Sequence, residues 1–237
     1  MTKRLLTLFV ASCVLAFLAP VQAGSAPLAA AVILAAVFTL GLVVRRAWRR
    51  RDDLRSSVAV ELNKIRRIYH LGRNLGTETH HRQWFTELHG SVYAYLSEFD
   101  KKPFSRFRET DAGFRKLSYH LYQVSGLETE KERALYRELL GAAGAAAEAR
   151  QRTWELWNGG LPSGAWTALT VLALASGAAA LGAMGPSDRW TAAFAITAVG
   201  TCFFLAREAD DLRHSAGEEL AKSYAENVAR LEMRREA

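Results

Sequence analysis

Residues 27–44 read PLAAAVILAAVFTLGLVV, an 18-residue run without a charged side chain, and RRAWRRR follows at once at 45–51. An α-helix rises about 1.5 Å per residue, so a helix of this length crosses a hydrocarbon core of about 30 Å. Arginines directly after such a run are typical of the cytoplasmic end of a transmembrane helix. The sequence therefore predicts a transmembrane helix over 24–44 and an integral membrane protein.

Two more apolar runs, 163–184 and 190–206, lie near the C-terminus, and the short polar turn GPSDR separates them. Each is long enough for a transmembrane helix, so the pair predicts a transmembrane hairpin over 162–206. The polar residues 45–161 are predicted to form a cytoplasmic four-helix domain, and 207–237 a cytoplasmic helical tail. The expected fold is all-α: a membrane helical bundle of three or four transmembrane helices in a 2+2 layout, with the cytoplasmic helical domain inserted between the two pairs.

The first 23 residues admit two interpretations. Lys3 and Arg4 precede an apolar run, and Val21 and Ala23 stand where a signal peptidase prefers small residues. Residues 1–23 are therefore either a signal peptide cleaved after Ala23 or a first transmembrane helix that stays in the chain. A helix this short would be accommodated by local thinning of the bilayer.

The basic excess lies between the membrane segments. Residues 45–161 hold 22 Lys and Arg against 15 Asp and Glu, whereas residues 207–237 hold 6 against 8. The positive-inside rule then places the middle domain and the C-terminus in the cytoplasm, in a multi-pass protein of the bacterial inner (plasma) membrane. The arginines after the first helix are expected to bind anionic lipid head groups, and no nucleic-acid partner is expected. These arginines are Arg45, Arg46, Arg49, Arg50 and Arg51.

Apolar residues recur at three- and four-residue steps through the middle domain, which predicts four helices and no sheet. The first continues directly from the transmembrane helix, and Gly72 and Gly76 weaken and end it. The second stops before Pro103, because proline cannot continue a helix without losing a hydrogen bond. The third carries the apolar residues of 104–124, and the fourth runs over about 128–157. The tail is expected to continue the last transmembrane helix.

The sequence contains no motif for catalysis or for a cofactor. It has no P-loop, no GxSxG elbow and no dinucleotide fingerprint, and its six histidines form no HExxH pattern. Cys13 and Cys202 lie in separate apolar runs and are expected to be free thiols. Acidic residues beside the membrane segments, such as Asp210, are expected to pair with the arginines of 45–51. We predict no enzyme activity, no catalytic residues, no cofactor and no metal site.

The apolar runs 27–44, 163–184 and 190–206 contain no Asp, Glu, Lys, Arg or His. This argues against proton relays and ion-coupled transporters, but a channel can be gated by an apolar constriction alone. In a symmetric pore, one series of side chains at four-residue steps would form apolar rings followed by positive rings, which favours anions. The candidate pore-lining series is Leu34, Phe38, Leu42, Arg46 and Arg50. The alternative is that the apolar members face lipid or the bundle core while the arginines hold head groups.

Helix packing and a family pattern extend this hypothesis. The run 163–184 is rich in Gly and Ala, including Gly177 and Gly182, which lets neighbouring helices approach and implies a bundle or a homo-oligomer. Further stretches match a known family: RIYHLG at 67–72, LSEF at 96–99, LYREL at 135–139, ARQR at 149–152, then Leu161-Pro162 and Trp166. On these residues the chain resembles the bacterial bestrophin-like domain family over roughly 25–206.

The resemblance implies the layout of bestrophins, which have two membrane helices before a cytoplasmic helical block and two after it. Bestrophins are pentameric anion channels whose second membrane helix lines the pore, and that helix corresponds to Pro27–Val44 here. The first hypothesis is therefore an oligomeric channel for small anions. The alternative is a non-conducting membrane scaffold or sensor whose cytoplasmic helices bind a protein partner.

Overall fold

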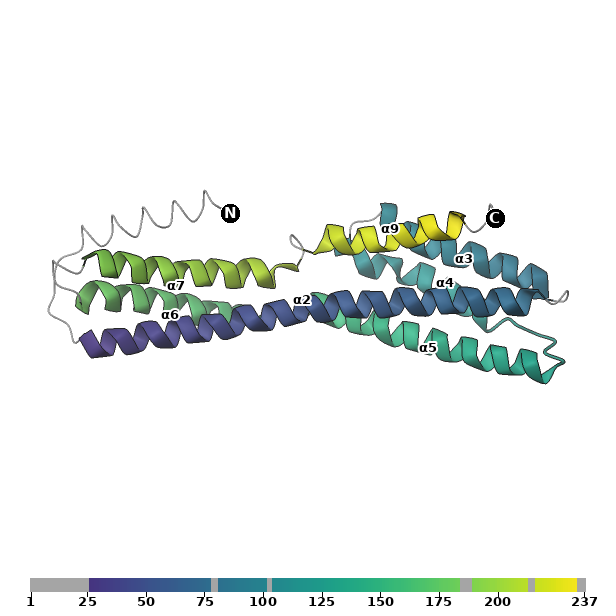
Figure 1. Ribbon diagram of the computed structural model, residues 1–237, viewed down its shortest axis with the longest axis horizontal. Helices are drawn as coiled ribbons and strands as arrows, with labels where there is room; N and C mark the ends of the chain where they lie inside the picture. The colour runs from purple at the N-terminus through teal and green to yellow at the C-terminus, as the bar shows by residue number, and fades with distance from the viewer. Residues whose placement is uncertain (1–25, 78–80, 102–103, 184–188, 213–215, 234–237) are drawn as a thin grey trace. The chain divides into compact units, whose positions relative to one another are not determined.

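The computed structural model describes residues 26–77, 81–101, 104–183, 189–212 and 216–233 (Figure 1). These residues form helices joined by turns, with no strand among them, which confirms the all-α prediction. The signal peptide or first transmembrane helix expected over 1–23 lies outside the described residues. The elements are α2 (Ala26–Gly76), α3 (Arg82–Lys101), η2 (Phe104–Thr110), α4 (Asp111–Leu121), α5 (Glu130–Asn158), α6 (Ser163–Ala183), α7 (Arg189–Asp210) and α9 (Gly217–Met233).

The chain divides into two compact units. We call residues 1–50 with 160–211 the membrane unit, and residues 51–159 with 212–237 the polar unit. Helix α2 is one uninterrupted helix that contributes its first half to the membrane unit and its second half to the polar unit. This confirms the prediction that the first helix of the middle domain continues directly from the transmembrane helix.

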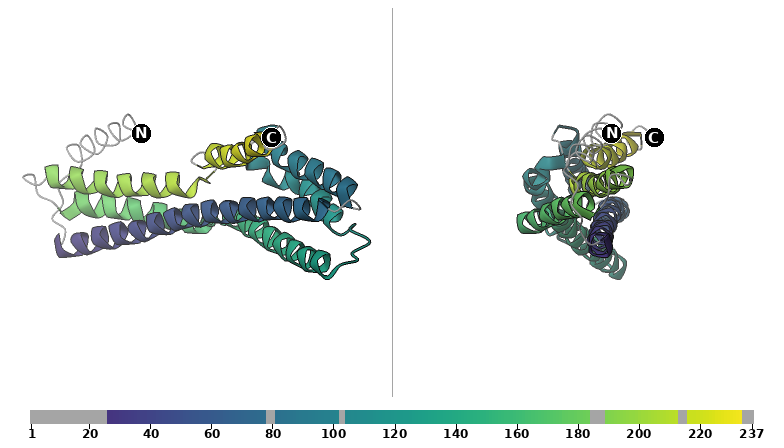
Figure 2. Two further views of the ribbon diagram at one scale, coloured as in Figure 1. Left: turned by 45° about the vertical axis from the view of Figure 1, so that its right-hand side comes forward. Right: turned by 90° about the vertical axis from the view of Figure 1, so that its left-hand side faces the viewer.

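The described part of the membrane unit is built from three helices. The first half of α2 lies beside α6 and α7 in both ribbon views (Figures 1 and 2). A small core joins them, in which Leu40 of α2 packs with Leu169 of α6 and with Val199 and Ala206 of α7. Within the described residues, three helical stretches are long and apolar enough to cross a membrane: Ala30–Gly76, Glu130–Gly182 and Arg189–Asp210.

Against the described residues, the glycines of α6 mediate no close packing. A Cβ atom added at Gly177 or Gly182 would meet no described atom within 4 Å. Close approach occurs instead in the polar unit, where a Cβ at Gly72 would lie 2.5 Å from Leu88 and one at Gly76 would lie 2.4 Å from Phe85. The expectation for Gly72 was therefore incomplete: α2 continues past it to Gly76, and both glycines let α3 pack tightly on α2.

The polar unit holds a large aromatic core. It combines the second half of α2 with α3, η2, α4, α5 and α9, and buried side chains from all of these elements form one cluster. Phe99 of α3 stacks on Tyr224 of α9 with ring centroids 3.8 Å apart, and Phe104 packs edge-on against Trp157 at 4.8 Å. Helix α9 is thereby part of the core and not a free tail.

The prediction for the third helix was wrong at both of its ends. The third helix begins as the 3-10 helix η2, and α4 ends at Leu121, so Val124 lies outside it. The reason is the spacing of Phe104, Phe107 and Thr110, which are all buried. Three-residue steps fall on one side of a 3-10 helix, because it has three residues per turn.

The tail does not continue the last of the predicted transmembrane helices. Helix α7 ends at Asp210, and a separate helix, α9, begins at Gly217. The carboxylate of Asp210 is held by partners outside α7, and the residues of α9 pack into the aromatic core of the polar unit. These two sets of contacts hold the end of α7 and the residues of α9 in place.

Helix α5 begins with a capping box. The Thr129 hydroxyl accepts from the Glu132 backbone N–H at 3.2 Å, and the Glu132 carboxylate accepts from the Thr129 N–H at 2.8 Å. We expect Thr129→Ala to lower the free energy of unfolding by about 1 kcal/mol, the usual effect of losing an N-cap side chain. Urea unfolding of the full chain in detergent, followed by circular dichroism, measures it. Thr86→Ala, at an exposed position inside α3, is the control, and an equal loss there would contradict the capping role.

Candidate pore face and buried charge cluster

One face of α2 in the membrane unit is apolar and uncovered. Leu34, Phe38 and Leu42 are 69%, 70% and 50% exposed, whereas Ala36 and Leu40 on the opposite side are fully buried. The structure thus places the three apolar members of the candidate pore series together, on the side of α2 that does not contact α6 or α7. We call Leu34, Phe38 and Leu42 the apolar face.

The arginines that follow the apolar face lie on different sides of α2. Each residue turns an α-helix by about 100°, so a four-residue step advances by about 40°. Counted from Leu34, Arg45 and Arg49 lie about 20° and 60° around the helix, whereas Arg46 lies about 120° and Arg50 about 160° around it. The arginines that continue the apolar face are therefore Arg45 and Arg49, and the four-residue rule used on the sequence missed them.

Arg50 is turned inward and engaged. Its side chain is mostly buried, and its Nη1 donates to Asp210 Oδ1 at 2.7 Å. The second carboxylate oxygen of Asp210 accepts from the Leu161 backbone N–H at 3.0 Å. One carboxylate thus ties the end of α7 to α2 and to the segment before α6. The expected pairing of Asp210 with the arginine cluster is confirmed, and Arg50 lies apart from the apolar face.

The remaining arginines differ in their surroundings. Arg45, Arg46 and Arg49 are exposed in the chain. Arg51 donates to Glu219 of α9 at 3.4 Å, and Arg55 donates to the same carboxylate at 2.6 Å. Of the five arginines expected to hold lipid head groups, Arg50 and Arg51 therefore have carboxylate partners within their own units.

The polar unit contains a buried charge cluster. Glu61 of α2 is 0% exposed and Arg150 of α5 is 6% exposed. The Tyr224 hydroxyl of α9 donates to Glu61 Oε2 at 2.9 Å, and the Tyr95 hydroxyl of α3 donates to Glu61 Oε1. Arg150 Nη1 donates to Tyr95 and lies 3.5 Å from Glu61 Oε1. Four helices meet at this cluster.

The other donors of Arg150 are also occupied. Its Nη2 donates to Asp111 at 2.7 Å and to the Thr110 hydroxyl at 2.7 Å, and its Nε donates to Asp111 at 3.2 Å. Its guanidinium lies 4.3 Å from the ring centroid of Phe107 and 5.2 Å from that of Phe114. Such cation–π contacts strengthen when they are desolvated. Arg150 therefore fixes η2 and α4 to the other helices of the polar unit.

Burial dominates the electrostatics of the cluster. It raises the pKa of Glu61, while Arg150 and the two tyrosine hydroxyls oppose the increase. Burial and the neighbouring Glu61 raise the pKa of Tyr95 and Tyr224 well above the ordinary value, so both phenols remain protonated donors. Glu61 is closed to solvent, and each side chain of the cluster forms a hydrogen bond within it. Such a cluster can hold the helices of the polar unit together.

Sequence reasoning missed this cluster, although a signal was present. Glu61 falls among Val58, Leu62 and Ile65 on the apolar stripe of α2, and Arg150 lies between the buried Ala149 and Thr153 of α5. A charged residue on a buried stripe indicates a partner in the core, because unpaired buried charges are very costly.

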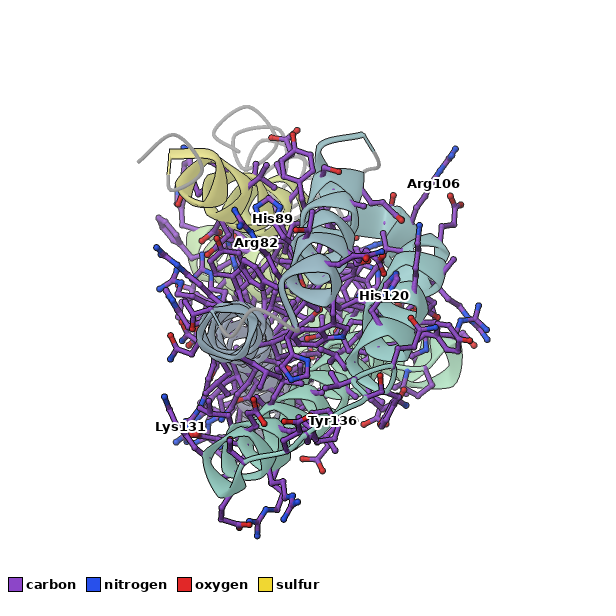
Figure 3. All side chains as sticks on the ribbon, turned by 90° about the vertical axis from the view of Figure 1, so that its right-hand side faces the viewer. Arg82, His89, Arg106, His120, Lys131 and Tyr136 are labelled. Carbon is purple, nitrogen blue, oxygen red and sulfur yellow. The ribbon has the colours of Figure 1, made fainter. Side chains whose placement is uncertain are left out.

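The described histidines of the polar unit form no metal site. His120 of α4 lies 3.9 Å from Glu87, and His81 lies 3.9 Å from Glu132. Figure 3 shows His89, His120 and Tyr136 at separate places, on α3, α4 and α5. Among the described residues, no three His, Cys, Asp or Glu side chains gather to hold a metal ion. Cys202 is a free thiol.

The comparisons with known proteins agree with the helical architecture. A crystal structure of a bacterial bestrophin homologue from Klebsiella pneumoniae, carrying a point mutation, is similar with a TM-score of 0.70 over 96% of this chain and 98% of that chain. The two sequences are 12% identical, so this similarity concerns the fold. No curated protein matches the sequence. The family model for the Bestrophin-like domain matches residues 6–214. The chain is therefore a membrane protein of the Bestrophin-like domain family.

Proposed function

We propose that the chain is the subunit of a homo-oligomeric channel for small anions in the bacterial inner membrane. The apolar face of α2 supports this proposal most directly, because it is an uncovered strip of large side chains that leads to Arg45 and Arg49. The family supports it as well, since the resemblance to bestrophins implies an anion channel in which this helix lines the pore. Residues 45–161 and 207–237 then lie in the cytoplasm, on the side of the arginines.

In this proposal the two parts of α2 have different tasks. Copies of Leu34, Phe38 and Leu42 form an apolar constriction around the axis, which opens and closes to ions by wetting and dewetting. Copies of Arg45 and Arg49 raise the local concentration of anions at the inner mouth. Arg46 stands at the edge of this lining, and Arg50 holds the helices of each subunit together through Asp210.

Contact with lipid is the competing explanation for an exposed apolar face. Helix α6 also exposes large apolar side chains, including Val171 and Leu174 at 61% and 70%. However, α6 has no charged residue along its length, so its exposed face leads to no cation. An apolar strip that continues into exposed arginines favours α2 as the pore helix.

Anion flux tests this proposal. Purified protein in liposomes is expected to release chloride, and Phe38→Ala is expected to raise the release rate about tenfold, which corresponds to a barrier lowered by about 1.4 kcal/mol. Leu174→Ala removes an equally exposed side chain from α6 and is expected to leave the rate unchanged.

Two outcomes would count against the channel. Release no faster than from empty liposomes, by protein shown to be folded and oligomeric, favours the non-conducting scaffold or sensor that binds a protein partner through its cytoplasmic helices. Equal effects of Phe38→Ala and Leu174→Ala would show that the face of α2 has no special relation to the pore.

A further inference from the structure

The polar unit contains a cavity of about 720 Å³ beside the buried charge cluster. It lies between η2 and α4 on one side and α5 on the other. This volume is within the usual range for small-molecule sites, about 300–1,000 Å³. Its lining includes Arg108, Arg115, Phe107, Phe114, Asp111 and Trp154.

The uncompensated charge in this cavity is positive. Asp111 accepts two hydrogen bonds from Arg150, and Glu109 forms an ion pair with Arg106 at 3.8 Å, so both carboxylates of the lining have cationic partners. Arg108 and Arg115 are exposed, and in the described part of the chain neither forms an ion pair or hydrogen bond. Two guanidinium groups thus remain available to an anion.

The cavity also has an aromatic wall. Trp154 and Phe114 are partly buried, so part of each ring stays accessible, and Phe107 is buried behind them. Arg108 lies over the Trp154 ring, 5.5 Å from its centroid. An indole face that already attracts a flat cation is also a surface on which a flat heterocycle stacks.

We propose that this cavity binds an anionic small molecule of the nucleotide class. The heterocycle stacks on Trp154, replacing the Arg108 guanidinium there, and Arg108 and Arg115 bind the phosphate oxygens. The planar guanidinium donates two parallel hydrogen bonds, which matches phosphate geometry. The inference goes beyond the proposed channel and does not depend on it, because binding is measured without ion flux.

Isothermal titration of the full chain in detergent tests the site, with ATP, AMP, adenosine and inorganic phosphate as probes. ATP and AMP are expected to bind more tightly than adenosine or phosphate, since each of the latter uses half of the site. Arg115→Gln is expected to weaken ATP binding about 10- to 100-fold, the effect of losing charge-assisted hydrogen bonds. Trp154→Leu is expected to weaken AMP and adenosine together.

Lys116→Gln is the matched control, because Lys116 is the exposed neighbour of Arg115 on α4 and does not line the cavity. It removes the same charge and is expected to leave binding unchanged. Circular dichroism of each variant establishes that it is folded. The proposal is overturned if the folded protein binds neither ATP nor AMP, if Lys116→Gln weakens binding as much as Arg115→Gln, or if phosphate binds as tightly as AMP and Trp154→Leu has no effect.

Discussion

Arg150→Met is expected to lower the free energy of unfolding of the polar unit by about 3–5 kcal/mol, the usual effect of removing one partner of a buried ion pair. Glu61 is 0% exposed, and Arg150 is the cation that contacts it. Methionine fills much of the space of the arginine stem, so the loss arises mainly from the charge and from the donors to Tyr95 and Asp111. Urea unfolding of the full chain in detergent, followed by tryptophan fluorescence, measures it.

Arg67→Met is the control for this prediction. Arg67 also links α2 to α5, through Glu138, but both side chains of that pair are about half exposed. Exposed ion pairs stabilise proteins by about 0–1 kcal/mol, so the control should lose little. Equal losses in the two variants would show that the buried cluster has no special weight in the polar unit.

A second substitution separates charge from packing. In the Arg150→Met background, Glu61→Gln is expected to restore part of the stability, because glutamine carries no charge. Its carbonyl oxygen still accepts from one of the two tyrosine hydroxyls, and its amide N–H can donate to the other. Lowering the pH should have the same effect. Burial raises the pKa of Glu61, and loss of Arg150 removes a group that opposes the increase. A carboxyl whose pKa is raised by folding stabilises the folded state at low pH, and this stability is lost as the pH rises through the folded pKa.

The sequence was sufficient to predict the elements whose signals are local. The helices over the apolar runs of α2, α6 and α7 needed only hydrophobic length, and α3 and α5 needed only the three- and four-residue spacing of apolar residues. The continuation of α2 through both units followed from the absence of a helix-breaking residue between Arg45 and Leu71.

Elements that depend on distant partners were missed. Helix α9 is separate from α7 because Tyr224 packs on Phe99 and bonds Glu61, and because Arg50 holds Asp210. These pairs are more than a hundred residues apart in sequence, so no local rule indicates them. The 3-10 conformation of η2 likewise depends on which of its side chains the core receives.

The prediction that the candidate residues share one face of α2 holds for the apolar members and fails for Arg50. Leu34, Phe38 and Leu42 do share an exposed face, because two steps of about 40° still leave them on one side of α2. A third and fourth step carry Arg46 and Arg50 away from it. This rotation of about 40° per four-residue step is a property of the α-helix and could have been computed from the sequence. The ion pair between Arg50 and Asp210 could be seen only in the folded chain.

The different positions of the arginines around α2 provide the most discriminating test of the proposed channel. Replacing both Arg45 and Arg49 by glutamine is expected to lower the ratio of anion to cation permeability about tenfold. A unit charge in water interacts with an ion 4 Å away by about 1 kcal/mol, and by less when salt screens it. The two arginines together therefore contribute about 1.4 kcal/mol, which corresponds to a factor of ten in the permeability ratio. The reversal potential across a planar bilayer under a potassium chloride gradient measures the ratio.

Arg46→Gln is the matched control for this double substitution. Arg46 is also exposed, but it lies about 60° further around the helix than Arg49, so its removal should shift the reversal potential less than the removal of Arg45 alone. If Arg46→Gln produced the larger shift, the pore axis would face a different side of α2, and Phe38 would then be a lipid contact. If no substitution altered the selectivity of a conducting protein, the arginines would act only as head-group anchors and the anion preference would have to arise elsewhere in the membrane unit.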